Sequence, residues 1–163
     1  MAARQDNVKI SAQNRKARRD FFVEDTYEAG MVLQGSEVKS LRKGDCSLDE
    51  AYARPEGEEL YLFDMHIAPY EQASIRNHEP TRPRKLLLHR REMDRIIAQC
   101  TQRGYTLVPL RVYFKEGFAK VEIALARRKR KWDKREKVAA EQRRKDARTE
   151  LGRASRRRSR LDR

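Results

Sequence analysis

The sequence predicts a mainly β protein: a small antiparallel barrel of five or six strands with two short inserted helices and a basic C-terminal tail. Three observations support this class. Segments of alternating polar and apolar residues recur through residues 21–126, turn residues separate them, and two stretches show the apolar spacing of a helix instead. Residues 127–163 contain too few large apolar side chains to form a core. We therefore expect a basic N-terminal arm (1–20), a β-barrel domain (21–126) and a basic tail (127–163).

The first predicted strand spans residues 21–29, because aromatic and β-branched residues alternate there with polar ones. Val23 and Tyr27 fall on its apolar face. Gly30 is predicted to mark a bulge or a bend, after which residues 31–33 continue the strand.

Two helices are predicted. The first spans residues 37–43, with Ser36 as its N-cap and Gly44 as its C-terminal stop. The second spans residues 90–103, and Gly104 ends it. Its apolar stripe, spaced i, i+3, i+4 and i+7, consists of Met93, Ile96, Ile97 and Cys100, all expected to pack in a core.

Two hairpins are predicted. Residues 48–54 and 59–65 flank a longer turn at residues 55–58, and residues 105–114 pair with residues 118–126. The second hairpin has one apolar face on each strand, formed by Leu110, Val112 and Phe114, and by Val121, Ile123 and Leu125.

Three segments lack a regular period. Residues 1–12 are expected to be a loose start, and residues 65–79 a surface loop. Prolines 80 and 83 disfavour helix in the residues that precede them, so residues 81–85 are expected to be extended.

The net charge of +14 is concentrated at the two ends of the chain. Residues 1–20 carry a net charge of +4 and residues 127–163 carry +12, whereas residues 21–126 carry −2. This distribution indicates a polyanionic partner rather than general solubility. Residues 14–19 place four cations directly before the first strand, which fits either a phosphate-contacting arm or a nuclear-localisation signal.

The sequence favours a binding protein over an enzyme. Cys46 and Cys100 have no CxxC partner, and His66, His78 and His89 lack metal-ligand spacing, so no metal or other cofactor is expected. No P-loop, nucleophile elbow or HExxH motif occurs in the sequence. A ribonuclease or a general RNA chaperone remains the alternative. No apolar run approaches the ~18 residues of a membrane span, and a reduced, cytoplasmic protein without a membrane partner is expected.

Two side chains suit nucleic-acid recognition. Glu28 lies on the polar face of the first strand, where its carboxylate can accept a hydrogen bond from a cytosine amino group or a 2′-hydroxyl. An ordinary solvated residue is the alternative. Trp132 lies in a segment without a core, which favours stacking on a base over local packing. Residues 138–151 have a helix-forming composition but little apolar surface, so the tail is expected to be disordered alone and helical against a polyanion.

Several motifs together resemble the SsrA-binding protein (small protein B) family of bacterial trans-translation, and the resemblance covers residues 8–137 in order. The motifs are Asn14–Arg18, Phe22–Glu24, Tyr27–Gly30, Gly35–Arg42, Thr81–Leu88, Leu107–Leu110 and Asp133–Arg135.

This resemblance implies a fold and a function. The fold is an oligonucleotide-binding-type β-barrel with short helices. The implied function is non-enzymatic: binding of the tRNA-like domain of transfer-messenger RNA and its delivery to stalled ribosomes. The resemblance further implies that the tail contacts small-subunit RNA at the decoding centre and becomes helical in the empty mRNA channel.

The resemblance also implies site residues. The RNA-binding polar residues fall on Asn14 and Glu28, and a contributing apolar residue falls on Leu87. Basic neighbours expected to contact phosphates are Arg15, Lys16, Arg18, Arg19, Lys39, Arg82, Arg84 and Lys85. Tail residues expected at the decoding centre are Lys129, Arg130, Trp132, Asp133, Lys134 and Arg135. Arg128 replaces a family glycine, and Trp132 stands where the family has another ring.

Overall fold

The computed structural model divides the chain into two compact units, Met1–Arg128 and Lys129–Arg163, which are described separately. The residues that the structure describes are 8–73, 76–130, 135–136 and 138–149.

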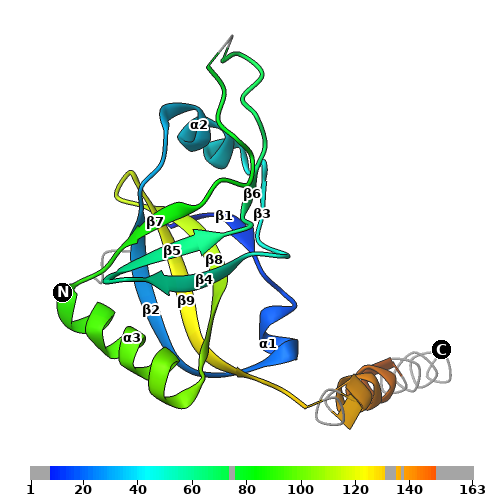
Figure 1. The fold of residues 1–163 in the computed structure, drawn as a ribbon. Helices are drawn as coiled ribbons and strands as arrows, with labels where there is room; N and C mark the ends of the chain where they lie inside the picture. Colours follow the sequence, from blue (N-terminus) through cyan, green and yellow to red (C-terminus); the bar gives the residue numbers. More distant parts are fainter. Residues whose placement is uncertain (1–7, 74–75, 131–134, 137, 150–163) are drawn as a thin grey trace, which may run out of the picture. The chain divides into compact units, whose positions relative to one another are not determined.

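Nine strands and three helices make up the described part of the first unit (Figure 1). The strands are β1 (Lys9–Gln13), β2 (Phe21–Met31), β3 (Cys46–Ser47), β4 (Tyr52–Glu56), β5 (Glu59–Phe63), β6 (His66–Ile67), β7 (Arg84–Leu87), β8 (Thr106–Lys115) and β9 (Phe118–Arg128). The helices are α1 (Ala17–Asp20), α2 (Gly35–Lys43) and α3 (Arg90–Arg103).

The strands close into an antiparallel barrel. The ring runs in the order β8-β4-β5-β7-β2-β9, and β9 pairs back with β8 to close it (Figure 1). β1 pairs with the C-terminal part of β8, beyond the residue of β8 that pairs with β4. β3 and β6 form a small separate sheet. The predicted barrel is confirmed.

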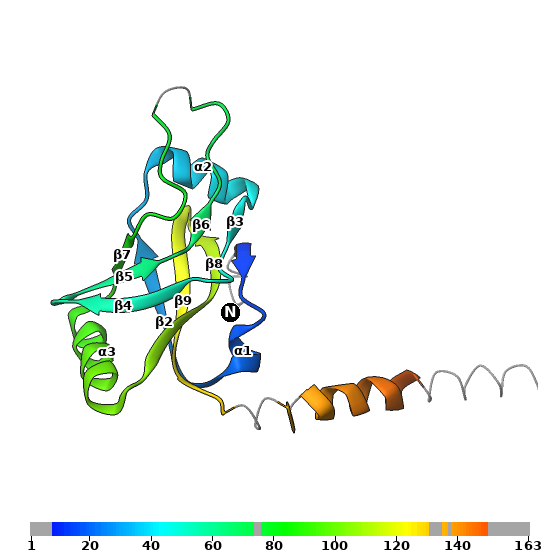
Figure 2. The ribbon, with the colours of Figure 1, turned by 45° about the vertical axis from the view of Figure 1, so that its right-hand side comes forward.

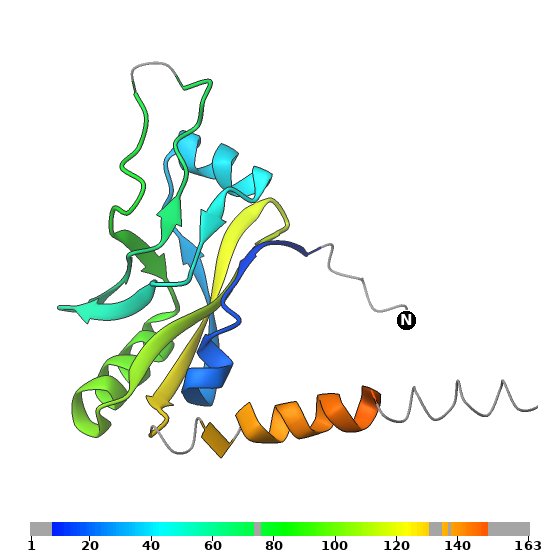
Figure 3. The ribbon, with the colours of Figure 1, turned by 90° about the vertical axis from the view of Figure 1, so that its right-hand side faces the viewer.

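Aliphatic side chains fill the ring, because alternate residues of each strand point inward. The buried interior residues include Ala29, Leu60, Leu62, Leu86, Val112, Val121 and Ile123. α3 and α2 lie at opposite ends of the barrel (Figures 2 and 3). Their apolar faces extend this core, with Met93 and Ile96 on α3 and Leu41 on α2.

The N-terminal segment differs from the loose start that the sequence predicts, because Lys9–Gln13 forms strand β1. β1 follows the outside of β8 and is exposed or half-buried along its length. Ile10 and Ala12 do alternate with Lys9, Ser11 and Gln13, so this strand carried a short period-two signal that the prediction did not use.

The bulge in β2 is not at Gly30, where the sequence predicts it. The strand continues through Gly30 to Met31, and its register against β9 shifts between Val23 and Asp25 instead. One extra residue reverses the alternation of faces. Val23 is therefore 39% exposed, although the residues that follow the bulge alternate as expected and Tyr27 is buried.

A second bulge divides the apolar face predicted for β8. The register against β9 shifts between Pro109 and Arg111. Leu110 consequently leaves the main core and packs with Ala17 of α1, whereas Val112 remains inside the ring. The face predicted for β9 is confirmed, since all three of its apolar residues lie in the main core.

The β4–β5 turn is shorter than predicted. Pro55 lies within β4, opposite Leu60, and the chain reverses through Gly57 and Glu58. Gly57 has a φ of +64°, a conformation that a two-residue hairpin turn requires and glycine adopts without strain.

The helix predictions are confirmed apart from one cap. α3 has the predicted bounds, and α2 ends as predicted at Gly44, which has a φ of +86°. α2 begins at Gly35, with Gln34 as its N-cap, so the prediction of Ser36 as N-cap is wrong.

Both cysteines are free thiols and half-buried, and Cys100 packs against the core as predicted. Burial raises the pKa of the Cys46 thiol to about 11 and also raises that of Cys100, which keeps both protonated. No cluster of metal-ligating side chains occurs among the described residues.

In the second unit, residues 135–136 and 138–149 are helical, and their side chains are exposed. Across the described parts of the chain, no helix is both long and apolar enough to cross a membrane.

Candidate nucleic-acid interface

Glu28 lies on the outer face of β2, with 40% of its side chain exposed. The buried Tyr113 on β8 donates its hydroxyl hydrogen to Glu28 Oε2, and Lys115 Nζ lies 3.8 Å from the same oxygen. Burial, together with this hydrogen bond, raises the pKa of Tyr113, so the phenol remains a donor. One carboxylate oxygen is thus fixed in place, and Oε1 remains open as an acceptor among the described residues.

Leu87 lies on the same outer face of the barrel as Glu28, on the neighbouring strand. It pairs with Gly30, which lies two residues from Glu28 and therefore on the same face of β2. Leu87 is 52% exposed, although it is a large apolar residue. A Cβ at position 30 would lie 3.4 Å from the Leu87 Cβ, an ordinary van der Waals distance. The structure thus places on one face two of the residues that the resemblance implies.

Asn14 is buried, and its side chain forms hydrogen bonds with backbone groups. Its Oδ1 accepts a hydrogen bond from Ala17 N at 3.0 Å, and its Nδ2 donates to Leu48 O at 3.3 Å. The expectation of a direct RNA contact by this side chain therefore does not fit the structure. Asn14 instead fixes the turn that leads into α1. That turn presents the exposed cations Arg15, Lys16, Arg18 and Arg19.

A shallow cleft of about 300 Å³ lies beside this turn. Lys16 lines it, but so do Asp20, Asp49 and Glu50. The three carboxylates disfavour a phosphate inside the cleft, and one of them, Asp20, also pairs with Arg19.

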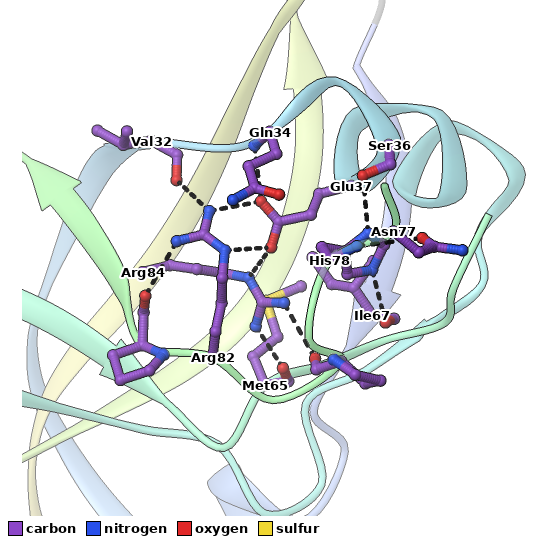
Figure 4. Close-up of polar contacts among 12 residues, drawn as sticks. Val32, Gln34, Ser36, Glu37, Met65, Ile67, Asn77, His78, Arg82 and Arg84 are labelled. Atoms are coloured by element: carbon purple, nitrogen blue, oxygen red, sulfur yellow. Dashed lines mark hydrogen bonds and ion pairs between the residues drawn. The ribbon is translucent and has the colours of Figure 1, made fainter. Parts of the chain in front are cut away.

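Glu37 is the centre of a buried ionic cluster (Figure 4). Arg82 donates from Nε to Oε1 at 2.9 Å and from its terminal nitrogen to Oε2 at 2.6 Å. Arg84 donates from Nε to Oε1 at 2.9 Å, and Gln34 N donates to Oε2 at 2.7 Å. Burial would raise the pKa of Glu37, but these donors outweigh it and lower the pKa. The carboxylate therefore stays ionised.

Arg84 is not available to a phosphate, although it was expected to contact one. Its side chain is fully buried, and its remaining donors bond to the carbonyl oxygens of Met65 and Pro80. The alternating pattern of β7 turns it inward toward Glu37. Arg82 has 24% of its side chain exposed, so it alone carries the excess positive charge of the cluster to the surface.

The segment between β6 and β7 is fastened to α2 by His78. Its Nε2 lies 3.0 Å from Ile67 O, which can only accept, so Nε2 carries the hydrogen. Nδ1 then accepts from Ser36 Oγ at 3.0 Å. The expected surface loop is therefore anchored at its end by a buried side chain. The spacing of histidines, used to exclude metals, gave no signal of this role.

The remaining predicted contacts lie in different surroundings. Lys85 pairs with Glu59 and is half-buried, whereas Lys39 on α2 lies 5.2 Å from the centre of the Tyr70 ring. In the tail, Lys129 is largely buried. Arg130 and Arg135 are exposed. Trp132, Asp133 and Lys134 lie outside the described residues.

Glu37 and Tyr113 have structural roles at the site that were not predicted from the sequence. Glu37 stands three residues after Gln34, the spacing of a helix capping box, which was an available signal. Tyr113 lies 85 residues from Glu28, and no local pattern joins them.

A closed β-barrel with an open carboxylate, an exposed apolar side chain and a cationic turn defines a small barrel protein suited to a polyanionic partner. Residues 11–153 match the model of the SmpB protein family, and the chain belongs to that family.

Curated relatives named SsrA-binding protein support the assignment. That of Geobacillus thermodenitrificans is 52% identical over 94% of this chain and 96% of its own. That of Roseiflexus castenholzii is 56% identical over 93% of this chain and 94% of its own. A solved chain from a structure described as "tmRNA-SmpB: a journey to the center of the bacterial ribosome" is 50% identical. It matches with a TM-score of 0.62 over 77% of this chain and 92% of that one.

Loss of the Glu37 carboxylate should destabilise the barrel strongly, because two arginines would lose their shared partner. Glu37→Ala is expected to lower the free energy of unfolding by about 3–5 kcal/mol in urea denaturation. Glu79→Ala, which removes an exposed carboxylate, is the control and should have little effect.

The same cluster predicts a pH dependence. Because the pKa of Glu37 is lowered from its ordinary 4.5, its contribution is complete above that value and is lost as the pH falls through the folded-state pKa. The stability of Glu37→Gln should therefore fall less steeply below pH ~4.5 than that of the parent. Equal slopes for the two proteins would contradict this assignment.

Proposed function

We propose that this chain is an RNA-binding adaptor of trans-translation. The barrel binds the tRNA-like domain of transfer-messenger RNA and brings it to stalled ribosomes. The observation that carries the proposal is the outer face that presents Glu28 and Leu87 on neighbouring strands, in a chain of the SmpB protein family. The names of the relatives and of the solved complex support the same partner and the ribosome. In this function the protein binds RNA without turning it over, needs no cofactor and works in the cytoplasm.

The parts of the barrel have separate tasks. Glu28 Oε1 accepts from a base amino group or a 2′-hydroxyl, and Leu87 packs against the sugar or base beside it. The turn held by Asn14 provides phosphate contacts through its four exposed cations. Arg82 adds a further cation at the edge of α2.

The tail has a second task, which is to sense an empty mRNA channel. Its cations, eighteen in residues 127–163, repel one another in isolation and are neutralised between RNA walls. A helix then becomes favourable, and residues 138–149 already have a helical conformation in the structure. At ~1.5 Å per residue those residues span ~18 Å. Trp132 precedes this helix in the sequence and stacks on an exposed base of the decoding centre.

Glu28→Ala is expected to weaken binding of the tRNA-like RNA by about 1–3 kcal/mol, or roughly fivefold to 150-fold. Simple electrostatics predicts the opposite, because the variant loses a negative charge. Glu24→Ala on the same strand is the matched control, since it removes an exposed carboxylate paired with Arg127. It should leave binding unchanged or slightly stronger. Fluorescence titration gives both affinities, and equal affinity of Glu28→Ala and the parent would reject this site.

Tyr113→Phe should also weaken RNA binding, but less than Glu28→Ala, because the acceptor remains and only its orientation is lost. The informative measurement is a double-mutant cycle. In the Glu28→Ala background, Tyr113→Phe is expected to have no further effect on affinity. Additive losses would show that Tyr113 acts independently of Glu28.

Trp132→Ala should leave RNA affinity in solution intact and impair peptide tagging on stalled ribosomes, because the stacking contact, worth about 1–3 kcal/mol, is lost. Trp132→Tyr should restore most of the tagging rate, since a ring is what stacking requires. The measurement is a reconstituted tagging assay with a message lacking a stop codon. An alanine variant that tags at the parent rate would remove Trp132 from the mechanism.

A further inference from the structure

The exposed side of α2 carries a cluster of cations that we name the α2 patch: Lys39, Arg42 and Lys43, together with Lys9 of β1. Lys39 Nζ and Lys43 Nζ lie 5.2 and 4.8 Å from the centre of the same ring, that of Tyr70. The patch lies at the end of the barrel that α2 covers (Figure 2).

The other two cations are held in a similar way. The Arg42 guanidinium lies 5.4 Å from the centre of the Phe114 ring, and Lys9 Nζ donates to the carbonyl oxygen of Arg42 at 2.9 Å. Among the described residues, no carboxylate oxygen lies within 4.0 Å of a cationic nitrogen of the α2 patch. Rings and a carbonyl thus position four charges without neutralising them.

Several cations of the strands are instead paired with carboxylates. Lys85 pairs with Glu59, Arg111 pairs with Glu122, and Arg127 pairs with Glu24. These pairs neutralise three cations on the outer faces of the strands. The α2 patch is therefore a local concentration of positive charge on a barrel whose residues 21–126 sum to −2.

Helix stability alone does not account for this arrangement. Cations near the C-terminus of α2 interact favourably with the helix dipole. Lys39 and Lys43, however, are like charges at i and i+4, which disfavours the helix, and both converge on one ring. An anion bound between their ammonium groups removes that repulsion.

Tyr70 is fixed where it meets the lysines. Its N–H donates to Asn77 Oδ1 at 3.1 Å, and Asn77 Nδ2 donates back to its carbonyl oxygen at 3.0 Å. His78, the next residue, is itself bonded to α2 through Ser36. The ring therefore belongs to a segment that is tied to the helix it serves.

We propose that the α2 patch is a second RNA contact of the barrel, which binds backbone phosphates of transfer-messenger RNA. This inference rests on the proposed function. An RNA whose bases or riboses meet the nearly neutral face around Glu28 needs countercharge for its backbone elsewhere, and the α2 patch supplies it. Lys39 and Lys43 contact phosphate oxygens, and Tyr70 holds their ammonium groups in place.

The test measures the affinity of the full-length protein for the tRNA-like RNA as a function of salt. The plot of log K against log salt has a negative slope. Removal of two phosphate contacts in Lys39→Ala/Lys43→Ala should make that slope shallower by about 1.4 to 1.8. With unchanged affinity at 1 M salt, this corresponds to roughly 15- to 30-fold weaker binding at 0.15 M. The control is Arg91→Ala/Arg103→Ala on α3, which removes the same charge from exposed positions and should leave the slope unchanged.

A second pair of variants tests the ring without changing any charge. Tyr70→Phe should bind like the parent, because the ring and its cation–π contacts remain. Tyr70→Leu should bind more weakly at 0.15 M salt. Circular dichroism confirms that each variant is folded.

The outcomes separate the two proposals. A parent protein that does not prefer the tRNA-like RNA over bulk RNA contradicts the proposed function itself. A parent that shows this preference, with Lys39→Ala/Lys43→Ala keeping the parent slope, overturns the α2 patch alone. Equal loss in the α3 control overturns it too, since general charge would then explain the effect. A double variant that binds RNA normally but binds ribosomes or acidic proteins poorly would also overturn it.

Discussion

One buried carboxylate, that of Glu37, holds together the end of the barrel that α2 covers. Glu37 on α2 binds two arginines at the entry into β7, and Arg84 in turn binds the carbonyl oxygens of Met65, which precedes β6, and of Pro80. Helix, loop and strand are thus joined through a single charged centre (Figure 4). Because the centre holds two cations and one anion, one positive charge remains, and it reaches the surface at Arg82. A structural requirement therefore also creates part of the surface charge.

Charged side chains have different partners in different parts of the protein. Strand faces carry ion pairs, whereas the cations of α2 contact aromatic rings. Ion pairs on exposed strands contribute little to stability, but they limit nonspecific attraction of phosphates. In the proposed function, affinity from charge and selectivity from the face with Glu28 and Leu87 are placed on different elements.

What the sequence could predict depended on whether the signal was local. α3 and the β8–β9 hairpin were predictable, because the apolar residues of each recur at the spacing of a helix or a strand within one short segment. β1 was missed although Ile10 and Ala12 alternate with polar residues, because so short a run is a weak signal. Leu110 was assigned to the wrong face because a bulge leaves no mark in the apolar pattern. The resemblance to a known family named Glu28 and Leu87 as site residues, and the fold places them on neighbouring strands.

The errors at charged positions have a different cause. A charged residue is expected on the surface unless the sequence also shows its partner. Glu37 lies 45 and 47 residues from Arg82 and Arg84, so no local pattern links them. Arg84 was therefore predicted to contact a phosphate, whereas in the fold it binds a buried carboxylate.

Glu28 shows how a long-range contact prepares an acceptor on the barrel surface. Tyr113 holds one oxygen of its carboxylate from β8, two strands away from β2, and Lys115 faces the same oxygen. Leu87 lies on the same outer face, opposite Gly30. In the proposed function, a group that donates to the open oxygen Oε1 is favoured, and a group that cannot donate leaves the charge without a partner. The selectivity proposed for this face then follows from the penalty for a wrong ligand as much as from attraction to the right one.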